Sequence, residues 1–308
     1  MGSAKGKQEN TLAACAKINL HLRVLNKRRD GFHNILSLMA QVGLADIITL
    51  TACEFTTDSE VSPEVEITVT GGGASEEIAD VPSGNNLISK AASAFCKAAG
   101  TGGKFVFSLE KNIPVGAGLG GGSADAAAAL TLLNANLHLP DDTLSKVASA
   151  VGADVPFLLQ GGLAICTGIG DEIEPVSVAD EMPYSVVLAN NGVQINTGAA
   201  YATLGRGETF AEVAGIEAGL RMAAKRFAAG DVSASKEFFN DFEDTVFARH
   251  SAVADLKQAM ISAGADFAIM SGTGSTIAGV FSNATVAESA VKFLQPNIKH
   301  VFLTSFVG

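Results

Sequence analysis

Basic residues, cysteines and long apolar runs are scarce in this chain of 308 residues. Its 21 lysines and arginines stand against 32 aspartates and glutamates, which gives a formal net charge of −11. Broad binding to nucleic acid or to an anionic membrane requires the opposite sign. No apolar run reaches the roughly 18 residues of a membrane span. The composition therefore predicts no nucleic-acid partner, no membrane partner and a cytoplasmic location, or the plastid stroma if the source is a plant or alga.

The four cysteines are too scattered to predict a metal site or a disulfide framework. Cys15, Cys53, Cys96 and Cys166 include no C-x-x-C pair, and the five histidines form no H-E-x-x-H motif. Each cysteine is therefore expected to be a small buried apolar residue. With 47% hydrophobic and 17% charged residues, the chain can bury a large core. Its length predicts about two domains, at roughly 150 residues each.

Glycine, by contrast, is concentrated in one stretch. Residues 113–130 read IPVGAGLGGGSADAAAAL, with five glycines in seven residues. We expect Ser123 to cap a helix that starts at Ala124 and ends near Asn136, with Asp125 in its first turn. Glycine lets other groups approach the backbone closely. A loop of bare N–H groups that leads into a helix N-terminus is an anion site, and phosphate is the usual anion.

Two other segments place polar residues among apolar ones. Cys15–Leu25 alternates with period two, which predicts a half-buried strand with Lys17 and Asn19 on one polar face. Solvent exposure is one explanation of that face, and a chemical role is the other, because Asn is a poor strand former. Asp154 lies in the apolar segment G-A-D-V-P-F. It is either a cap or turn carboxylate, or a poorly solvated base.

The remaining pattern predicts a mixture of helices and strands. Helices are expected at 87–99 with Asn85 or Asn86 as cap, at 142–150 with Asp141 or Asp142 as cap, and at 253–263 and 284–294. Residues 210–229 are expected to form one helix or a pair of helices. An apolar stretch lies at 35–42, and strands are expected at 46–52, 104–109, 184–189, 266–270, 276–281 and 300–304. The acidic stretch 54–86 is expected to form a solvated hairpin and loop. The last third reads strand–helix–strand–strand–helix–strand, the split βαβ pattern.

Three interpretations of the glycine stretch compete. Gly116, Gly118 and Gly121 match the dinucleotide fingerprint G-x-G-x-x-G, but about 110 residues precede them, whereas that fingerprint normally sits at the first strand–helix turn. A Walker-type loop is excluded because no lysine follows the last glycine. The third interpretation is a different phosphate loop, with Pro114 before the glycines and Ser123 after them.

Six blocks in order resemble the GHMP kinase superfamily. The glycine stretch resembles its phosphate-loop signature. The other five resemble the branch that acts on a cytidine diphosphate methylerythritol in the non-mevalonate isoprenoid pathway: AKINLHL (16–22), RRDGFH (28–33), NLI (86–88), GADVPF (152–157) and SGTG (271–274). Two residues depart from the family pattern: Phe32 replaces the usual Tyr, and Ala124 replaces a second Ser, so Ser123 alone keeps a hydroxyl there.

This resemblance implies an α+β fold with two lobes. The N-terminal lobe, of the ribosomal-S5-domain-2 type, would span 1–165 and bind ATP. The ferredoxin-like C-terminal lobe would span 166–308 on the substrate side. ATP would be the phosphoryl donor with Mg²⁺, and the protein would be a monomer or weak homodimer. Asp154 would act as base for the 2-hydroxyl of the methylerythritol moiety, with Lys17 beside it.

The resemblance also implies the binding residues. For ATP these are Asn86, Lys111, Pro114, Val115, Gly116, Ala117, Gly118, Leu119, Gly120, Gly121, Gly122, Ser123 and Ala124, with Asn86 and Lys111 near the adenine and Ser123 also as metal ligand. For the cytidine substrate they are Asn19, Phe32, His33, Thr197, Tyr201, Gly272, Thr273 and Gly274. Phe32 would stack on the cytosine ring. The segment Gly272–Gly274 has a second explanation as a plain hairpin turn.

Other functions stay open on the sequence alone. One is another GHMP kinase, of the homoserine or mevalonate type, whose substrates have no cytosine for Phe32 to stack on. A second is a nicotinamide-dependent oxidoreductase that uses Gly116–Gly121. A third is a non-catalytic nucleotide-binding member, which the joint presence of Lys17 and Asp154 disfavours.

Overall fold

The computed structural model describes residues 10–58, 62–71, 86–178, 181–209 and 213–308. Contacts within the chain group it into two compact units. The first comprises Met1–Cys15, Ala45–Val115 and Gly121–Leu159, and the second comprises Ala16–Leu44, Gly116–Gly120 and Gln160–Gly308. The chain thus passes between the units more than once. A lobe boundary near residue 165 stays a prediction, because units built from contacts need not coincide with the lobes of a fold.

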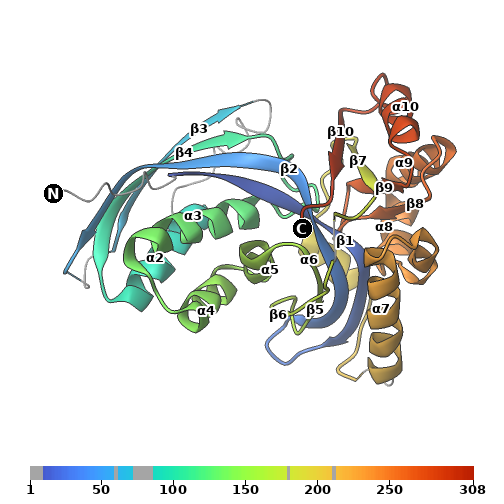
Figure 1. Cartoon of the computed structure of the whole chain (residues 1–308). Helices are drawn as coiled ribbons and strands as arrows, with labels where there is room; N and C mark the ends of the chain where they lie inside the picture. Colours follow the sequence, from blue (N-terminus) through green and yellow to red (C-terminus); the bar gives the residue numbers. More distant parts are fainter. Residues whose placement is uncertain (1–9, 59–61, 72–85, 179–180, 210–212) are drawn as a thin grey trace. The chain divides into compact units, whose positions relative to one another are not determined.

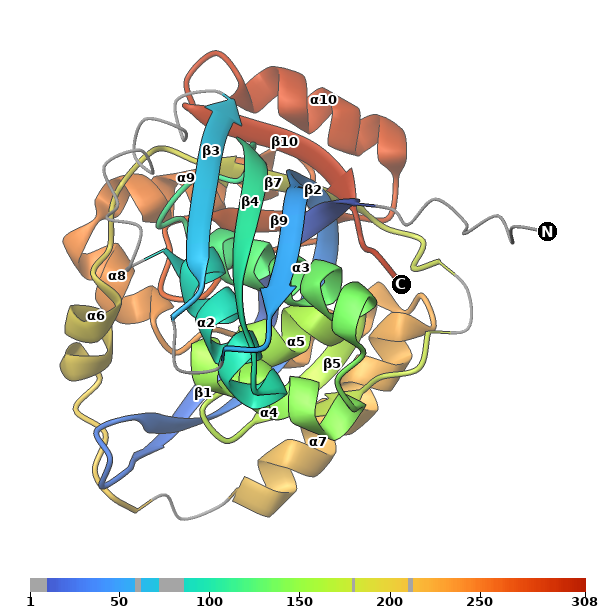
Figure 2. The same cartoon turned by 90° about the vertical axis from the view of Figure 1, so that its left-hand side faces the viewer.

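The first unit packs three helices on a sheet. Its strands are β2 (His33–Thr56), β4 (Gly102–Lys111) and β3 (Glu64–Gly71), of which β2 and β4 are antiparallel from Ile47 onward and β3 is parallel to β4. Helices α2 (Leu87–Ala99), α3 (Gly121–Leu137) and α4 (Asp141–Val151) lie on one face of this sheet (Figures 1 and 2). Phe95, Phe105 and Phe107 are fully buried in its core.

The hairpin predicted within the acidic stretch 54–86 stays a prediction, because much of that stretch lies outside the described part of the chain. The described part contains β3, which runs parallel to β4, and the chain between these two strands includes α2, as a parallel crossover requires. Residues 59–61 and 72–85 of that stretch lie outside the described part of the chain, as does Asn85.

Two long strands contribute to both units. They are β1 (Thr11–Lys27) and β2, which is one strand of 24 residues where the sequence predicted an apolar stretch and then a strand that starts at Asp46. Asp46 is fully buried within β2. In the structure its carboxylate accepts hydrogen bonds from the backbone N–H groups of Asn112 and Ile113, at 2.6 and 2.8 Å. A satisfied polar side chain does not interrupt the strand.

The second unit contains the predicted split βαβ pattern. Strands β7 (Ser185–Asn190), β8 (Phe267–Met270), β9 (Ile277–Phe281) and β10 (His300–Ser305) form an antiparallel sheet in the order β10-β7-β9-β8. Helices α9 (Ser251–Ser262) and α10 (Ala284–Leu294) cover one face of it (Figure 1). Beside β2 lie β5 (Leu163–Thr167) and β6 (Glu172–Pro175). The ferredoxin-like expectation for the C-terminal part is confirmed.

The remaining helices show where sequence periodicity succeeds and fails. α2 and α10 have the predicted bounds, and the Asn86 side chain caps α2 by accepting from the N–H of Ile88. α7 (Val213–Ala228) lies in the predicted range. α4 is preceded by Pro140, with no side-chain cap, so Asp141 and Asp142 are its first residues and not its caps. Elements too short for a periodic signal escaped prediction: α5 (Val155–Gln160), α6 (Thr197–Thr203), η2 (Val232–Glu237) and α8 (Glu243–Arg249).

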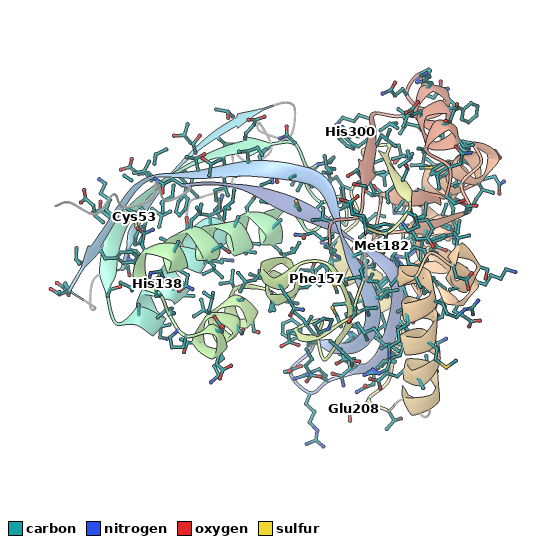
Figure 3. The ribbon with its side chains drawn as sticks, in the orientation of Figure 1. Cys53, His138, Phe157, Met182, Glu208 and His300 are labelled. Carbon is teal, nitrogen blue, oxygen red and sulfur yellow. The ribbon has the colours of Figure 1, made fainter. Side chains whose placement is uncertain are left out.

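The cysteines behave as small apolar residues. All four are free thiols. Cys96 and Cys166 are buried, and Cys15 and Cys53 are half-buried; Figure 3 labels Cys53. Burial raises the pKa of the Cys53 thiol to about 11, so it is not a nucleophile at neutral pH. In the described part of the chain, no helix is both long and apolar enough to span a membrane.

Candidate functional site

The segment Gly116–Gly120 of the second unit has the backbone of an anion-binding loop. Its φ angles are positive at Gly116, Gly118 and Gly120, at 65°, 80° and 70°, and not at the two residues between them. Alternation of this kind turns successive N–H groups toward one concave side, called a nest. The carbonyls of Ala117 and Leu119 face protein donors instead: they accept from the N–H groups of Thr276 and Lys17, at 3.2 and 2.9 Å. The loop is thus anchored through its carbonyls.

A second glycine segment packs directly on this loop. A Cβ on Gly118 would lie 2.2 Å from the carbonyl oxygen of Ser271, so only glycine fits there. The Ser271 hydroxyl donates to the Gly118 carbonyl at 2.8 Å and accepts from the N–H of Asn19 at 3.2 Å. The segment from Ser271 to Thr276 is therefore part of the same arrangement as the glycine loop, and it does more than connect β8 to β9.

The other end of the glycine stretch belongs to the first unit and opens α3. The helix begins at Gly121, not at Ala124, so Ser123 lies inside its first turn and is not the N-cap. Gly120, with its positive φ, already turns the chain, and that is why the better capping residue is not used. The first-turn N–H groups of Gly121, Gly122, Ser123 and Ala124 have no partner within the helix, which suits an anion.

A buried ion cluster lies beneath this first turn. The Lys111 ammonium, 2% exposed, pairs with the Asp46 carboxylate and with that of Asp125, the latter at 2.8 Å. Asp125 is thus a buried ion-pair partner deeper in α3, and its prediction as a first-turn carboxylate was wrong because α3 starts earlier. Burial raises the pKa of Asp125 to about 7 against the attraction of Lys111. This cluster ties β4 and the segment before Pro114 to α3.

On β1, both faces are buried. Lys17, Asn19 and His21 are 5%, 1% and 2% exposed, so the polar face is not a solvent face. The Lys17 ammonium donates to the Asn19 Oδ1 at 2.7 Å, and Asn19 Nδ2 donates to the Ser37 hydroxyl at 2.8 Å. Ser37 in turn donates to the His21 carbonyl at 2.7 Å. The structure therefore brings Lys17 and Asn19 together and fixes both side chains.

Three of the predicted substrate residues are aromatic or imidazole groups. The rings of His33 and Tyr201 lie with centroids 5.0 Å apart, although 168 positions separate them in the sequence. Tyr201 also meets Phe242 edge-on at 4.8 Å. Phe32 is 57% exposed in the turn before β2, where its N–H donates to Asp30. Partial burial, with the nearby Lys27 ammonium, lowers the pKa of His33, which favours the neutral form of its ring.

The predicted threonines meet at one point of the second unit. The hydroxyls of Thr197 and Thr273 lie 3.2 Å apart. Thr197 opens α6, whose cap Asn196 accepts from the N–H of Ala199. Gly272 and Gly274 flank Thr273, both with positive φ. A Cβ on Gly272 would lie 3.7 Å from the Asn19 Oδ1, so this segment faces the polar side of β1.

Asp154 lies in the first unit, together with Pro114 and Val115. It is half-buried and directly precedes α5, where its carbonyl accepts from the N–H of Leu158 at 3.1 Å. Lys17 belongs to the second unit. The partnership of Lys17 and Asp154 therefore stays a prediction.

Sequence reasoning missed two polar residues that shape these segments. Asp46 holds the backbone before Pro114 and pairs with Lys111. Asn240, 5% exposed, donates to the carbonyls of both Met270 and Gly272 at 2.7 Å. The sequence pattern that could have identified Asn240 is a polar residue among aromatic ones, since it lies in the run F-F-N-D-F.

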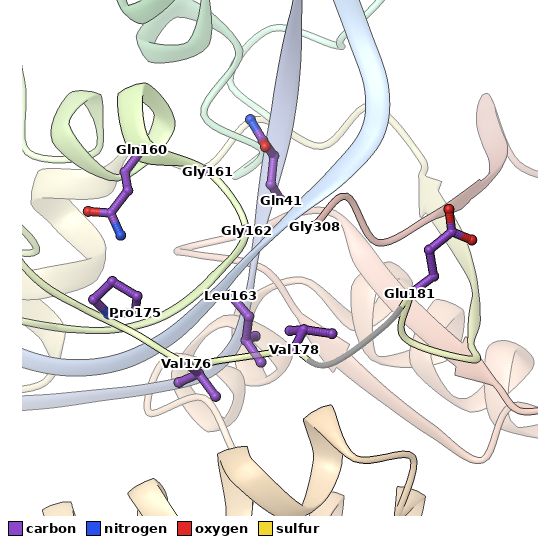
Figure 4. Close-up of a pocket in the computed structure, with 10 residues that line it drawn as sticks. All are labelled: Gln41, Gln160, Gly161, Gly162, Leu163, Pro175, Val176, Val178, Glu181 and Gly308. Atoms are coloured by element: carbon purple, nitrogen blue, oxygen red, sulfur yellow. The ribbon is translucent and has the colours of Figure 1, made fainter.

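A surface pocket of the second unit lies elsewhere (Figure 4). Its lining includes Gln41, Gln160, Leu163, Val176 and Glu181. None of the residues predicted for ATP or substrate belongs to it, and Glu181 is the one ionisable side chain among its ten lining residues. It is not the candidate site.

Comparisons with known proteins agree with this geometry. The sequence profile of the GHMP kinases N terminal domain matches residues 86–162, and that of the GHMP kinases C terminal matches residues 223–298. A 4-diphosphocytidyl-2-C-methyl-D-erythritol kinase of Thermodesulfovibrio yellowstonii is 33% identical over 92% of this chain and 94% of its own length. The protein of that name from Prosthecochloris aestuarii is 35% identical over 96% of this chain and 97% of its own length.

Solved structures extend the likeness to the fold. The crystal structure of a 4-(cytidine 5'-diphospho)-2C-methyl-D-erythritol kinase superposes with a TM-score of 0.74, at 29% identity, over 97% of this chain and 99% of that chain. A homoserine kinase from Cytophaga hutchinsonii superposes with a TM-score of 0.69 at 17% identity, over 99% of this chain and 98% of that chain. At that identity the second likeness shows the fold alone.

Proposed function

This chain belongs to the GHMP kinase family, and we propose that it transfers the γ-phosphoryl group of ATP to the 2-hydroxyl of 4-diphosphocytidyl-2-C-methyl-D-erythritol. This is a step of the non-mevalonate route to isoprenoid precursors. The observation that carries the proposal is the likeness to relatives of that name at 33% and 35% identity over more than nine-tenths of the chain. The neighbouring His33 and Tyr201 rings, tilted by 31° to each other, support a cytidine substrate, since a nucleobase needs an aromatic wall with polar edges.

Phosphoryl transfer requires mainly positioning and charge stabilisation. The nest of Gly116–Gly120 and the open first turn of α3 supply N–H groups for the ATP phosphates. Pro114, Val115, Ala117, Leu119 and Ala124 act through the backbone shape of this stretch. Asn86 and Lys111 were expected near the adenine. The Lys111 ammonium already pairs with two carboxylates, so its role is to fix the backbone before Pro114.

The chemical step needs a base for a tertiary alcohol. Asp154 takes the proton of the substrate's 2-hydroxyl while the oxygen of that hydroxyl attacks the γ-phosphorus of ATP. The bond between the γ-phosphorus and the β-γ bridging oxygen breaks, and ADP leaves. Lys17 stabilises the negative charge that develops, and Asn19 orients the ammonium through the 2.7 Å hydrogen bond. General-base assistance of this type is worth roughly 10²–10⁴ in rate.

The cytidine end is bound by groups of the second unit. Phe32, with its exposed ring, stacks on the cytosine, and His33 reads the base edge with its neutral imidazole. Tyr201 holds the His33 ring in place. Thr197, Gly272, Thr273 and Gly274 offer hydroxyls and bare backbone to the rest of the substrate. Since Phe32 lacks the family's usual hydroxyl, its contribution is stacking alone.

Mg²⁺ fits this site only in company with the nucleotide. Among the described residues, no group of three or more His, Cys, Asp or Glu side chains is arranged to hold a metal ion. The Ser123 hydroxyl, half-buried in the first turn of α3, is an oxygen donor of the kind Mg²⁺ accepts, and ATP oxygens would supply most of the other ligands. When bound, the ion neutralises phosphate charge.

The alternatives make different demands on the structure. A dinucleotide fingerprint requires a parallel βαβ unit around the glycines. Here the next strand after α3 is β5, which pairs antiparallel with β2, so the nicotinamide alternative lacks its framework. A homoserine or mevalonate kinase shares the fold but has no use for a base-stacking wall.

A parallel assay separates these functions. ATP is supplied with the cytidine diphosphate methylerythritol, with homoserine or with mevalonate, and ADP release is followed. Release with the first acceptor alone supports the proposal; release with another acceptor instead, or with none while NAD binds, contradicts it. Asp154→Asn should lose turnover and still bind ATP, whereas near-normal turnover would remove Asp154 as the base.

A further inference from the structure

One side chain without an assigned role, that of Asn240, forms hydrogen bonds to the backbone where the segment Ser271–Thr276 begins. Asn240 is buried, and its Nδ2 donates to the carbonyls of Met270 and Gly272, both at 2.7 Å. Its Oδ1 accepts from the N–H of Phe242 at 2.9 Å. All three hydrogen bonds go to backbone, so the side chain fixes the course of two chain segments at once.

The backbone on either side of Asn240 is fastened to β1. The Leu22 N–H donates to the Phe239 carbonyl at 2.8 Å, and the Asp241 N–H donates to the Leu22 carbonyl at 2.9 Å. Three residues along β1, the Asn19 N–H donates to Ser271. The links form a closed ring within the second unit, from β1 to the 239–242 segment, through Asn240 to the Ser271–Gly274 segment, and back to β1.

Both parts of the second unit that are proposed to bind ligands are joined to this ring by hydrogen bonds. Ser271 donates to the Gly118 carbonyl, which belongs to the nest proposed for the ATP phosphates. Thr273 meets Thr197, which is proposed for the cytidine substrate. A shift of the Ser271–Gly274 segment would move both parts relative to Lys17 and Asn19.

We propose that Asn240 is a positioning residue of the kinase: it holds the Ser271–Gly274 segment at the register in which the phosphate nest and the Thr197–Thr273 pair face the polar side of β1. The inference rests on the proposed function, because it takes those two groups as ligand contacts. Asn240 itself is not among the residues proposed to contact ATP or the acceptor.

The chemistry of the position favours an amide. Two carbonyls require two N–H donors, and Phe242 requires an acceptor, all within reach of one short side chain; Asn supplies this set. An aspartate of the same shape would direct a second oxygen at the two carbonyls and leave both without a donor. On the other side, Glu243 Oε1 accepts from the Met270 N–H at 2.9 Å, so Met270 is fixed through both backbone groups.

The test compares Asn240→Asp with Asn191→Asp in the full chain. Asn191 also donates its Nδ2 to a backbone carbonyl, that of Ala252 at 3.0 Å, but outside the Ser271–Gly274 segment. For Asn240→Asp we expect kcat to fall about 30-fold or more, with KM for ATP and for the acceptor changing less than about 3-fold, since positioning is lost and contacts are kept. Asn191→Asp should keep wild-type constants.

A pH profile and a milder variant sharpen the result. The Asn240→Asp defect should shrink between pH 7.5 and 5.5, because burial raises the pKa of the new carboxyl and its protonated form donates one hydrogen bond again. Asn240→Ser, which can donate a single hydrogen bond, should lose about 5-fold in kcat. Equal losses in the Asn240 and Asn191 variants, or a loss confined to KM, would overturn the proposal.

Amide hydrogen exchange keeps the inference separate from the proposed function. Residues 270–276 and 116–120 should exchange faster in Asn240→Asp than in Asn191→Asp, with or without turnover. Unchanged exchange in both segments would refute the positioning role even in an active enzyme. The proposed function would be refuted if the wild-type protein did not phosphorylate the cytidine substrate. Faster exchange in Asn240→Asp would still show, in that case, that Asn240 positions the Ser271–Gly274 segment.

Discussion

Each unit has a buried polar cluster that contains a lysine, and the contacts described for the two lysines differ. In the first unit Lys111 faces two carboxylates, those of Asp46 and Asp125, and the three charges close on one another. In the second unit the Lys17 ammonium donates to a neutral amide oxygen, that of Asn19, and the chain of hydrogen bonds continues through Ser37. The contacts of Lys111 are thus with carboxylates on β2 and α3. Those described for Lys17 lie on the polar face of β1, where we propose that its ammonium stabilises the negative charge that develops on a substrate.

The largest effect should come from breaking the charged cluster. Lys111→Met leaves two buried carboxylates without a counter-charge, and loss of one partner of a buried ion pair costs about 3–5 kcal/mol. We expect the free energy of unfolding to fall by that amount, measured by urea denaturation at pH 7.5. An unchanged unfolding curve combined with a raised KM for ATP would instead show that Lys111 serves the nucleotide, as the sequence predicted.

The matched change on β1 should affect the rate most. Lys17→Met removes an ammonium of similar burial, and this is the ammonium that we propose stabilises charge in the transition state. We expect kcat to fall about 10²–10³-fold, the usual cost of removing one group that stabilises transition-state charge. If Lys17→Met and Lys111→Met lose the same stability and the same rate, the distinction between the clusters fails.

The sequence predicted one of these clusters better than the other. Period-two alternation in β1 placed Lys17 and Asn19 on a shared face, because strand geometry converts spacing directly into orientation. The charged cluster joins residues at 46, 111 and 125, and no local pattern relates them. The start of α3 was misplaced for a similar reason: capping preference selected Ser123, while the turn at Gly120 decides where the helix begins.

Hydrogen bonds to distant backbone carbonyls were also not predictable from the sequence. Asn240 donates to carbonyls 30 and 32 positions away, and every residue has a backbone carbonyl, so residue type does not indicate which one is the partner. The resemblance to GHMP kinases named Gly272 and Gly274 as substrate residues, which stays a prediction, and gave no reason for glycine at these positions. The structure gives one: both have positive φ, and a Cβ on Gly274 would lie 2.8 Å from the Met270 sulfur.

A smaller effect should distinguish the exposed aromatic from the enclosed one. Phe32→Ala removes a ring that is 57% exposed and should leave stability unchanged. Base–aromatic stacking is worth about 1–3 kcal/mol, so KM for the cytidine substrate should rise about 10-fold with KM for ATP constant. Phe32→Tyr, which restores the family's usual residue, is the control and should keep a low KM. A KM in Phe32→Ala that matches wild type would leave the cytosine without its stacking partner.

The smallest effect concerns a third buried polar side chain, His21, which shares the β1 face with Lys17. Its ring lies 4.3 Å from that of Phe239, and its Nδ1 is 3.2 Å from the Glu237 carbonyl. Burial, with a smaller effect of Arg23, lowers the pKa of His21 from 6.5 to about 4. Between pH 6.5 and about 4, His21 is therefore protonated in the unfolded chain but not in the folded protein. Stability from this group is complete above pH 6.5 and falls as the pH drops, by at most about 1.4 kcal/mol per pH unit.

His21→Asn isolates that slope, since the Asn amide can still donate to Glu237 and does not titrate. The free energy of unfolding, measured at intervals from pH 7 to pH 4.5, should fall more steeply in the wild type than in the variant, and the two curves should converge toward acid. Parallel curves would mean that the folded protein accepts the proton on His21. The polar face of β1 would then accept a second positive charge near Lys17, and the prediction that burial keeps His21 neutral would fail.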